Sequence, residues 1–443
     1  MADKMYDIII IGGGAAGLTA AYSAGSVAEN IKIAVLEKMP RPGRKIMITG
    51  KGRCNLTNMK DWSDFSGHIH PKANFLKPAF YTFNPAETAV FFNNAGMETV
   101  TERGDRVFPA SYIAADVVDA LVRSAAGVGV NIETGKEVEN IACKGSDNQS
   151  SFEITCRNGE TLLCKKIIIA TGGLSYPSTG STGDGYRWAE ENGHKISRLF
   201  PSLTAIVPEN YKITDSRGHI NRSAPLSEAG KLLNGNQLKN TSISLWLNGN
   251  IAQEEFGDID FTDGGIEGPL GFKVSRKCVE ALLNGRKAQL VLDLKPAVSY
   301  EALQNRISKL WKEICEDRRN FSKSYKDKFH ILLGKLMPRS LIQGFLKCNQ
   351  SADHKTIARY LKNWKFNISG YVGYERCVIT AGGISQEDIT AKTMESKKCK
   401  GMYFAGEVID IDGDTGGYNL QSAFSTGYLA GLSAARSLSS DID

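Results

Sequence analysis

Three glycines near the N-terminus have the spacing of a phosphate-binding turn. Gly12, Gly14 and Gly17 fit the pattern G-x-G-x-x-G and follow an apolar run from Ile8 to Ile11. Such a run is typical of a strand that is buried on both faces. The first glycine permits a tight turn, the second lets a pyrophosphate approach the backbone, and the third allows close helix packing. The pattern therefore indicates a dinucleotide site.

An acidic residue at the expected distance supports this interpretation. Glu37 ends a second apolar strand, 37 − 17 = 20 residues after Gly17. A carboxylate at this spacing commonly accepts a hydrogen bond from a ribose hydroxyl. The residues between favour a helix, whose N-terminal amides and positive dipole end would face the phosphates. This stretch alone fits NAD and FAD equally well.

A glycine-rich, basic segment follows at residues 39–58. Its glycines allow close backbone approach to a ligand, and its lysines and arginines can offset phosphate charge. An ordinary surface loop with solvated charges is the alternative. We favour ligand contact because the segment directly follows the ribose-binding strand. Cationic neighbours of Cys54 would depress its thiol pKa, but no partner cysteine is close in sequence.

A second glycine turn follows another expected strand. Lys166 to Ala170 is apolar and leads into Thr171, Gly172 and Gly173, which lets the chain turn close beside a cofactor. The later run GSTGDG has the spacing G-x-x-G-x-G. We therefore predict no second, independent dinucleotide motif.

The C-terminal region repeats the combination of a strand, an acid and a glycine turn. Met402 to Ala405 is an expected buried strand that ends at Gly406 and Glu407. The carboxylate is placed to accept from a sugar-alcohol hydroxyl. A glycine-rich turn then leads into a helix that we expect to begin near Asn419, with its dipole end at a second polar site.

Length and composition restrict the remaining possibilities. The chain has 443 residues, enough for two or three domains, and a net charge of +6, which is modest at this size. Nine cysteines are scattered without a C-x-x-C motif or a close redox pair, and metal-ligand spacing is absent. The chain enters a core strand without a cleavable leader, and no apolar run approaches the ~20 residues of a membrane helix. We expect a cytoplasmic protein with no membrane contact.

The middle of the chain changes character twice. Residues 70–126 favour helices, with a turn or short hairpin at 101–111. Residues 130–143 and 151–164 alternate as strands around a loop at 146–150. Residues 201–335 contain expected strands at 203–208, 242–247, 252–261 and 289–294, with helices from 300 onward that carry more basic than acidic residues. We favour a solvated helix face over a nucleic-acid surface there.

Three segments resemble a known family: GKGRCNLTN at 50–58, FTDGGIEGPLGFKVS at 261–275, and the stretch at 393–427. With the N-terminal motif, they look like the bacterial FAD-dependent flavoproteins known as aminoacetone-oxidase-like or bile-acid-inducible-reductase-like (BaiN-like) proteins. The resemblance implies an α/β fold of the two-dinucleotide-domain flavoprotein type. It implies a Rossmann-type FAD-binding domain at 1–200 and 367–443, an inserted β-barrel-like domain at 201–335, and a small helical domain at 336–366.

The resemblance also implies a set of contacts to non-covalent FAD. Those near the adenine end are Gly12, Gly14, Ala15, Ala16, Gly17, Glu37, Lys38 and Val138. Those near the pyrophosphate and the flavin are Arg44, Lys45, Gly52, Arg53, Cys54, Asn55, Thr171, Gly172, Gly406, Glu407, Asp414, Gly417, Tyr418, Asn419 and Gln421. The family often carries His where Asp263 stands, so a substrate role for this position is in doubt.

Two functions remain open. The first is a FAD-dependent oxidoreductase that acts on a small organic molecule by C=C reduction or amine oxidation, with NAD(P)H as a transient co-substrate or O₂ as acceptor. The second is a non-catalytic or RNA-associated flavin-binding module that uses the helices at 300–335. We favour the enzyme and expect no nucleic-acid partner. No catalytic residue and no oligomeric state are assigned.

Overall fold

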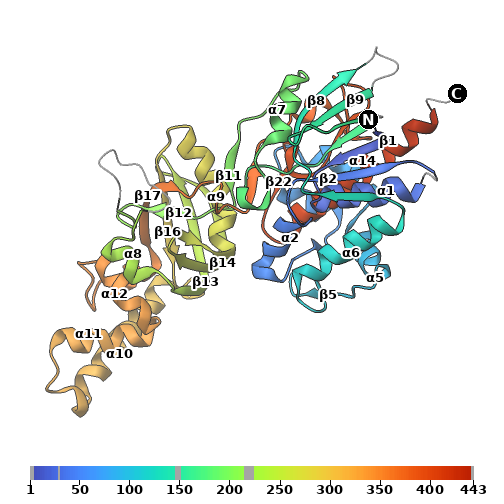
Figure 1. The fold of residues 1–443 in the computed structure, drawn as a ribbon. Helices are drawn as coiled ribbons and strands as arrows, with labels where there is room; N and C mark the ends of the chain where they lie inside the picture. The colour runs from blue at the N-terminus through green and yellow to red at the C-terminus, as the bar shows by residue number, and fades with distance from the viewer. Residues whose placement is uncertain (1–3, 28–29, 145–150, 214–223, 441–443) are drawn as a thin grey trace. The chain divides into compact units, whose positions relative to one another are not determined.

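The computed structural model describes residues 4–27, 30–144, 151–213 and 224–440 (Figure 1). They form two compact units, defined as unit 1 (Met1–Phe200 and Val378–Asp443) and unit 2 (Pro201–Cys377). The expected loop at 146–150 lies outside the described residues. Both ends of the chain thus belong to one unit, as the resemblance implied.

A parallel sheet forms the centre of unit 1. Its strands are β7 (Asn131–Thr134), β2 (Ile33–Glu37), β1 (Lys4–Ile11), β10 (Thr161–Ile169) and β21 (Met402–Phe404), in that order across the sheet. Each neighbouring pair is parallel. Numbered along the chain, the order is 3-2-1-4-5, the arrangement of a doubly wound Rossmann-type sheet. The central position of β1 explains why its apolar run is buried on both faces.

Antiparallel strands join this sheet at β10 and beyond β21. β8 (Val138–Lys144) pairs with β9 (Ser151–Cys156), which pairs with β10, so the expected strand hairpin is confirmed. β19 (Ile389–Thr390) and β20 (Glu395–Ser396) continue the sheet beyond β21.

Close packing of two helices joins the ends of the chain. α1 (Ala15–Val27) follows β1, and α14 (Tyr418–Ser440) ends the described chain. A Cβ atom at Gly427 would lie 2.2 Å from the Ala16 carbonyl oxygen, and one at Gly431 would lie 2.1 Å from that of Ala20. Because glycine has no side chain, Gly427 and Gly431 let the backbones of α14 and α1 approach each other closely.

The remaining elements of unit 1 flank this framework. A hairpin of β5 (Thr99–Glu102) and β6 (Arg106–Pro109) confirms the turn expected at 101–111. The other elements are α2 (Arg44–Ile48), β3 (Thr57–Asn58), α3 (Trp62–Phe65), β4 (Ile69–His70), α4 (Lys77–Thr82), α5 (Pro85–Asn94), α6 (Ala114–Gly127), α7 (Asp184–Glu191), β18 (Ile379–Ala381) and β22 (Asp412–Gly413). The short strand β11 (Phe200–Ser202) begins at the last residue of the first segment of unit 1 and continues into unit 2.

Unit 2 contains a closed barrel, which confirms the expected β-rich insertion. Around the barrel the order is β12 (Ile206–Pro208), β15 (Gly265–Glu267), β14 (Asn250–Thr262), β13 (Gln237–Leu247), β16 (Ala288–Asp293) and β17 (Trp364–Tyr371). Antiparallel pairing of β12 with β17 closes it. The sequence placed the return to the Rossmann-type domain at residue 367. In the structure β17 is a barrel strand, and the compact unit continues to Cys377.

The helices of unit 2 share one hydrophobic core with the barrel. They are α8 (Glu228–Leu233), α9 (Gly268–Leu283), α10 (Tyr300–Glu316), α11 (Tyr325–Leu336), α12 (Arg339–Cys348) and α13 (Ile357–Lys362). Trp364 on β17 packs against Phe345 of α12, with ring centroids 4.9 Å apart. The stretch 336–366 is therefore continuous with the barrel core and is not a separate domain. Within the described residues, no helix has both the length and the apolar character needed to span a bilayer.

Candidate functional site

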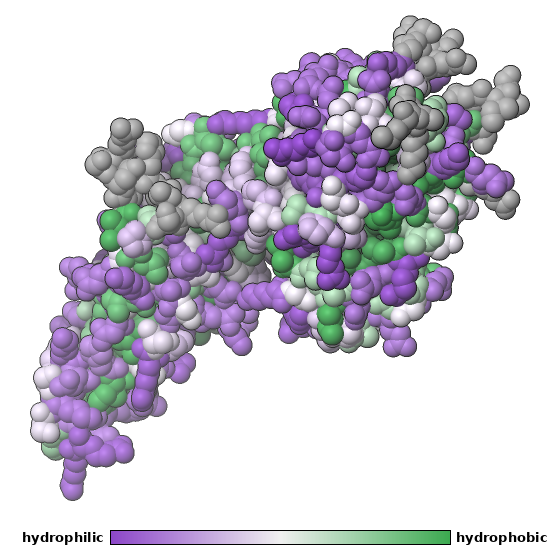
Figure 2. Space-filling view, viewed as in Figure 1, coloured by the Kyte–Doolittle hydropathy of each residue, from purple (hydrophilic) through white to green (hydrophobic). Residues whose placement is uncertain are grey.

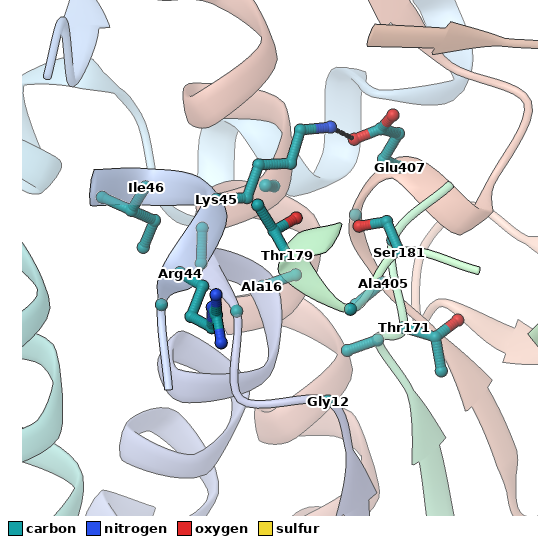
Figure 3. A pocket seen from close by; sticks show the side chains of 18 of the residues that line it. Gly12, Ala16, Arg44, Lys45, Ile46, Thr171, Thr179, Ser181, Ala405 and Glu407 are labelled. Carbon is teal, nitrogen blue, oxygen red and sulfur yellow. Dashed lines mark hydrogen bonds and ion pairs between the residues drawn. The ribbon is translucent and has the colours of Figure 1, made fainter. Parts of the chain in front are cut away.

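Residues from both ends of the chain line one cleft in unit 1. The lining begins at the carboxyl ends of the parallel strands. Ile11 and Glu37 are the last residues of β1 and β2, and Ala170 and Ala405 directly follow β10 and β21. The cleft holds about 1300 Å³ of unfilled space, open solvent included. Carboxyl ends of strands are where open α/β sheets bind their ligands. Figure 3 shows Lys45, from the N-terminal part of the chain, reaching Glu407 of the C-terminal segment.

The three glycines of the N-terminal turn have three different geometric roles. Gly12 has φ +105°, and a Cβ there would lie 2.5 Å from the Ala170 carbonyl oxygen. A Cβ at Gly17 would lie 1.9 Å from the Gly12 carbonyl oxygen. At Gly14, by contrast, a Cβ would meet no atom of the described residues within 4 Å. Gly12 and Gly17 are therefore required by the fold, while Gly14 borders open space in the cleft.

Glu37 braces the same turn. Its Oε2 accepts a hydrogen bond from the Gly13 amide and its Oε1 accepts one from the Met39 amide, both at 2.8 Å. Burial is the largest effect and raises the pKa of the Glu37 carboxyl, although these two hydrogen bonds act to lower it. Each oxygen keeps a further lone pair, so the carboxylate can also accept from a ribose hydroxyl. The adjacent Lys38 pairs with Asp184, with Nζ 2.7 Å from Oδ2.

A partly buried ion pair connects the two ends of the chain across the cleft. The Lys45 Nζ lies 2.5 Å from the Glu407 Oε2 (Figure 3). The Ser175 hydroxyl donates to the Glu407 Oε1 at 2.6 Å, and the Thr380 amide donates to the same oxygen at 2.8 Å. Gly173 leaves room for this network, since a Cβ there would lie 2.8 Å from the Glu407 Oε1.

The turn before α14 is held by Asn419. Its Oδ1 accepts from the Gly413 amide and its Nδ2 donates to the Gly413 carbonyl, both at 2.7 Å. At Gly417, a Cβ would lie 2.4 Å from the Thr57 carbonyl carbon. The expected helix start near Asn419 is confirmed within a residue, because α14 begins at Tyr418.

Asp414 forms an ion pair beside this turn. Its Oδ2 lies 2.8 Å from the His68 Nδ1, and its Oδ1 lies 3.6 Å from the His70 Nε2. Burial alone would raise the pKa of the Asp414 carboxyl, but hydrogen bonds and charge from the two histidines lower it to about 2. The Tyr418 ring stacks on His68, with centroids 4.3 Å apart.

The segment around Cys54 differs from the sequence expectation. Burial raises the pKa of the Cys54 thiol to about 12, so the expected lowering by cationic neighbours is wrong. Arg53 instead stacks over Phe108, with its guanidinium carbon 4.9 Å from the ring centroid. Among the described residues, the buried Asn55 Oδ1 finds no hydrogen-bond partner.

The fold brings two distant cysteines together. The Cys399 Sγ lies 3.4 Å from the Cys143 Sγ, although the two residues are 256 positions apart. The two cysteines are not close in sequence, so the absence of a close redox pair from the sequence did not predict this contact, which is formed by the fold.

The cleft lining contains more than half of the residues expected to bind the cofactor. These are Gly12, Gly14, Ala15, Ala16, Glu37, Lys38, Arg44, Lys45, Thr171, Gly172, Gly406, Glu407 and Asn419. Outside the lining are Gly17, Gly52, Arg53, Cys54, Asn55, Val138, Asp414, Gly417, Tyr418 and Gln421. Gln421, for example, is fully buried and donates to the Phe83 carbonyl at 2.9 Å. Cofactor contact by any of these residues stays a prediction.

Several lining residues were missed by the sequence reasoning. They include Thr49, Lys136, Thr179, Gly180, Ser181, Asp184, Trp188, Ile379, Ile411, Leu420, Ser422, Ala423 and Thr426. A signal existed for some of them, because the run from Thr179 to Asp184 follows the turn at Gly172 and Gly173. The apolar members carry no such signal, since core and cleft residues look alike in sequence.

The chain is similar to several known proteins. Over 443 residues the chain is 29% identical to a 3-dehydro-bile acid delta(4,6)-reductase of Clostridium scindens, covering 97% of this chain and 99% of that protein. Over 434 residues it is 28% identical to a ribosomal RNA dihydrouridine synthase of Escherichia coli, covering 96% and 97%. A solved 3-ketosteroid delta1-dehydrogenase of Sterolibacterium denitrificans is 14% identical at a TM-score of 0.49, covering 98% of this chain and 100% of that one.

A match to a protein-family model determines the family of this chain. The model described as HI0933-like protein Rossmann domain matches residues 6–433, which is nearly the whole chain. The match confirms the expected family of flavoprotein oxidoreductases and the Rossmann-type fold. This chain belongs to the HI0933-like family of Rossmann-domain proteins.

Proposed function

We propose that this chain is a FAD-dependent reductase that saturates a carbon–carbon double bond conjugated to a carbonyl group. The observation that carries the proposal is the single cleft lined from both ends of the chain. A Rossmann-type turn stands at one part of its wall, and the Gly406–Glu407 step and the start of α14 stand at another. An extended dinucleotide is the class of ligand that such a two-ended site suits.

The cleft residues fit FAD. Gly14 borders space into which a pyrophosphate can move, and α1 begins at the next residue with its amides and positive dipole end. Among the described residues, the buried Thr171 hydroxyl has no hydrogen-bond partner, although it lines the cleft. Buried polar groups are normally paired, so a polar ligand would satisfy it. Arg44 brings positive charge to a site for phosphates.

The chain's own residues have separate roles in this proposal. When bound, FAD supplies hydride transfer. The turn at Gly12–Gly17 holds the adenosine diphosphate part, with Glu37 bracing the turn and accepting from the ribose. The C-terminal residues Gly406, Glu407 and Asn419 hold the ribityl and ring part. Apolar residues such as Ile379, Ile411 and Leu420 line the cleft and exclude water from it.

The names of the relatives favour reduction over amine oxidation. A delta(4,6)-reductase removes steroid double bonds, and a dihydrouridine synthase saturates the C=C bond of a uracil ring. In both substrates the double bond is conjugated to a carbonyl. Addition of a hydride to one carbon therefore produces an enolate, and protonation of the other carbon gives the saturated product. We propose NADH or NADPH as the hydride source for the flavin, and a cytoplasmic location where both are present.

A uridine base in RNA is the second candidate substrate. Between residues 317 and 362 the chain has 11 Lys and Arg against 3 Asp and Glu, so this stretch carries 11 − 3 = +8, while the whole chain carries +6. Phe321 and Tyr325 are exposed within it, and Trp311 stacks on His354. Figure 2 shows a mainly hydrophilic surface over α10 and α11. Basic side chains with interleaved aromatic rings suit RNA, so this surface weighs against our expectation of no nucleic-acid partner.

Anaerobic flavin reduction and reoxidation test the proposed reaction. The purified protein is reduced with NADH or NADPH, and its flavin absorbance is followed after addition of a 3-oxo-4,6-diene steroid, an unmodified ribosomal RNA fragment, or an amine panel. Reoxidation by the steroid or by the RNA supports conjugated C=C reduction and identifies the substrate class. Reduction of the oxidised flavin by an amine, with neither acceptor reoxidising it, contradicts the proposal.

The RNA candidate has its own control. Arg318→Gln with Lys326→Gln removes two exposed charges, and it should weaken RNA binding and lower the salt slope by about 0.7 per lost contact. Lys72→Gln removes a lysine that is also exposed but lies in unit 1, and it should change nothing. Equal RNA affinity in both variants excludes this surface as the docking site.

A further inference from the structure

Lys45 and Glu407 have a coupled role that the family motif does not assign. Resting on the proposed FAD site, we infer that Glu407 acts on the cofactor through Lys45. In this arrangement the carboxylate holds the ammonium against the flavin half of the cleft and does not itself accept from a sugar hydroxyl. Glu407 is then a positioning residue, and Lys45 is the group that contacts the ligand.

The hydrogen bonds of Glu407 support this assignment. Its Oε1 accepts from the Ser175 hydroxyl and the Thr380 amide, and its Oε2 accepts from Lys45. The side chain is only 11% exposed. The Oε1 accepts twice and has no lone pair left for a sugar hydroxyl, and the Oε2 faces the Lys45 ammonium. The length of the glutamate side chain carries the carboxylate to all three partners.

The local structure fixes the position of Lys45. It lies in the first turn of α2, just after Gly43, whose φ is +69°. A Cβ at Gly43 would lie 2.6 Å from a methyl of Val118, so the entry to the helix is fixed by packing. The ammonium also donates to the Ser175 hydroxyl. An ammonium has three N–H donors, and two of them bond to Glu407 and Ser175, so one remains for a ligand.

The remaining donor has a suitable chemical target. Lys45 lines the cleft and its side chain extends across it to Glu407 (Figure 3). A fixed cation in a partly dry site stabilises negative charge that develops on a bound group. The polar edge of a flavin carries more negative charge when the ring is reduced. Lys45 should therefore favour the reduced state, and loss of its anchor should weaken this effect.

Glu407→Asp is the decisive variant, because it keeps the charge and shortens the side chain by one methylene. If the carboxylate served a sugar hydroxyl, aspartate, which keeps both acceptor oxygens, should largely preserve FAD affinity. If it positions Lys45, Glu407→Asp should raise the FAD dissociation constant at least tenfold and lower the preference for the reduced state about tenfold. For a two-electron couple, that is about 30 mV in midpoint potential. Wild-type affinity and potential in this variant overturn the inference.

A double-mutant cycle gives an independent test. Lys45→Met alone should weaken FAD binding, and Lys45→Met with Glu407→Asp should be no weaker than Lys45→Met, because the positioned group is already gone. Fold losses that multiply indicate two separate contacts and overturn the inference. ADP, which lacks the flavin half, should bind all variants within twofold, and a parallel loss of ADP affinity places Lys45 at the phosphates instead. A wild-type protein without FAD binding refutes the proposed function itself, whereas FAD binding unchanged by Glu407→Asp refutes only this step.

Discussion

Substitution of two neighbouring glycines should separate folding from ligand binding. Gly14→Ala and Gly17→Ala add the same methyl group three residues apart. At Gly17 the new Cβ would lie 1.9 Å from the Gly12 carbonyl oxygen, so the turn must open. At Gly14 it would project into the cleft, with no atom of the described residues within 4 Å. We expect the first variant to lose stability and the second to lose FAD.

The size of each effect follows from the geometry. Gly14 immediately precedes α1, where alanine costs a few tenths of a kcal/mol relative to glycine, while the loss of unfolded-chain entropy returns about 0.4–1 kcal/mol. The Gly14→Ala apoprotein should thus match the wild type within about 1 kcal/mol. Blocking two hydrogen bonds to charged phosphate costs roughly 1.5–3 kcal/mol each, or about 10²- to 10⁴-fold in affinity. Gly17→Ala should cost at least the ~1–3 kcal/mol of an overpacked core.

Thermal unfolding of flavin-free protein and equilibrium FAD titration measure the two effects. Gly14→Ala should keep its apoprotein Tm within about 4 °C and bind FAD at least a hundredfold more weakly. Gly17→Ala should unfold at clearly lower temperature. Full FAD affinity in Gly14→Ala, or an unchanged Tm in Gly17→Ala, refutes the assigned roles of this turn.

Three further predictions concern the surrounding framework. Gly427→Ala should lower the Tm, because its Cβ would lie 2.2 Å from a backbone oxygen of α1. Gly127→Ala is the control and should not lower the Tm, because its Cβ would have no such contact among the described residues. Equal Tm values for the two variants contradict this packing. Asp414→Asn should lower the free energy of unfolding by up to about 2 kcal/mol above pH 4, since the pKa of the Asp414 carboxyl falls from an ordinary 3.8 to about 2 on folding. The difference in stability between the variant and the wild type should vanish as the pH falls from 4 to 2. A loss of stability that is independent of pH contradicts the pairing with His68. Diamide should link Cys143 to Cys399, whose sulfur atoms are 3.4 Å apart, in a bond that peptide mass spectrometry detects and dithiothreitol reverses; both thiols remaining free contradicts the geometry.

Local patterns made the Rossmann-type part of the fold predictable. The apolar run of β1, the three glycines and the acid at the end of β2 lie within 31 residues, and each has a physical reason that acts over a few neighbours. The start of α14 was also predictable, because a glycine turn and a helical pattern adjoin. The closed barrel was less so. β17 completes it by pairing with β12, far away in sequence, so its residues were partly assigned to the wrong unit.

Partners far apart in sequence were beyond prediction. Lys45 and Glu407 are 362 positions apart, and both were expected to bind the cofactor, but nothing in either motif indicated that they bind each other. Cys54 shows the opposite error. Its cationic neighbours in sequence suggested a reactive thiol, but burial dominates and raises the pKa to about 12. Burial depends on the whole fold, so short-range charge patterns cannot determine it.

Equilibrium titration of the flavin-free protein with FAD, with ADP as competitor, tests the central claim most directly. One cleft framed by both ends of the chain predicts one FAD per chain, displaced competitively by ADP, because ADP occupies the part at Gly12–Gly17. FAD should bind more tightly than ADP, since only FAD reaches the C-terminal turn. Protein that is colourless as purified and gains no bound flavin on titration contradicts the account, as does FAD binding that saturating ADP leaves unchanged.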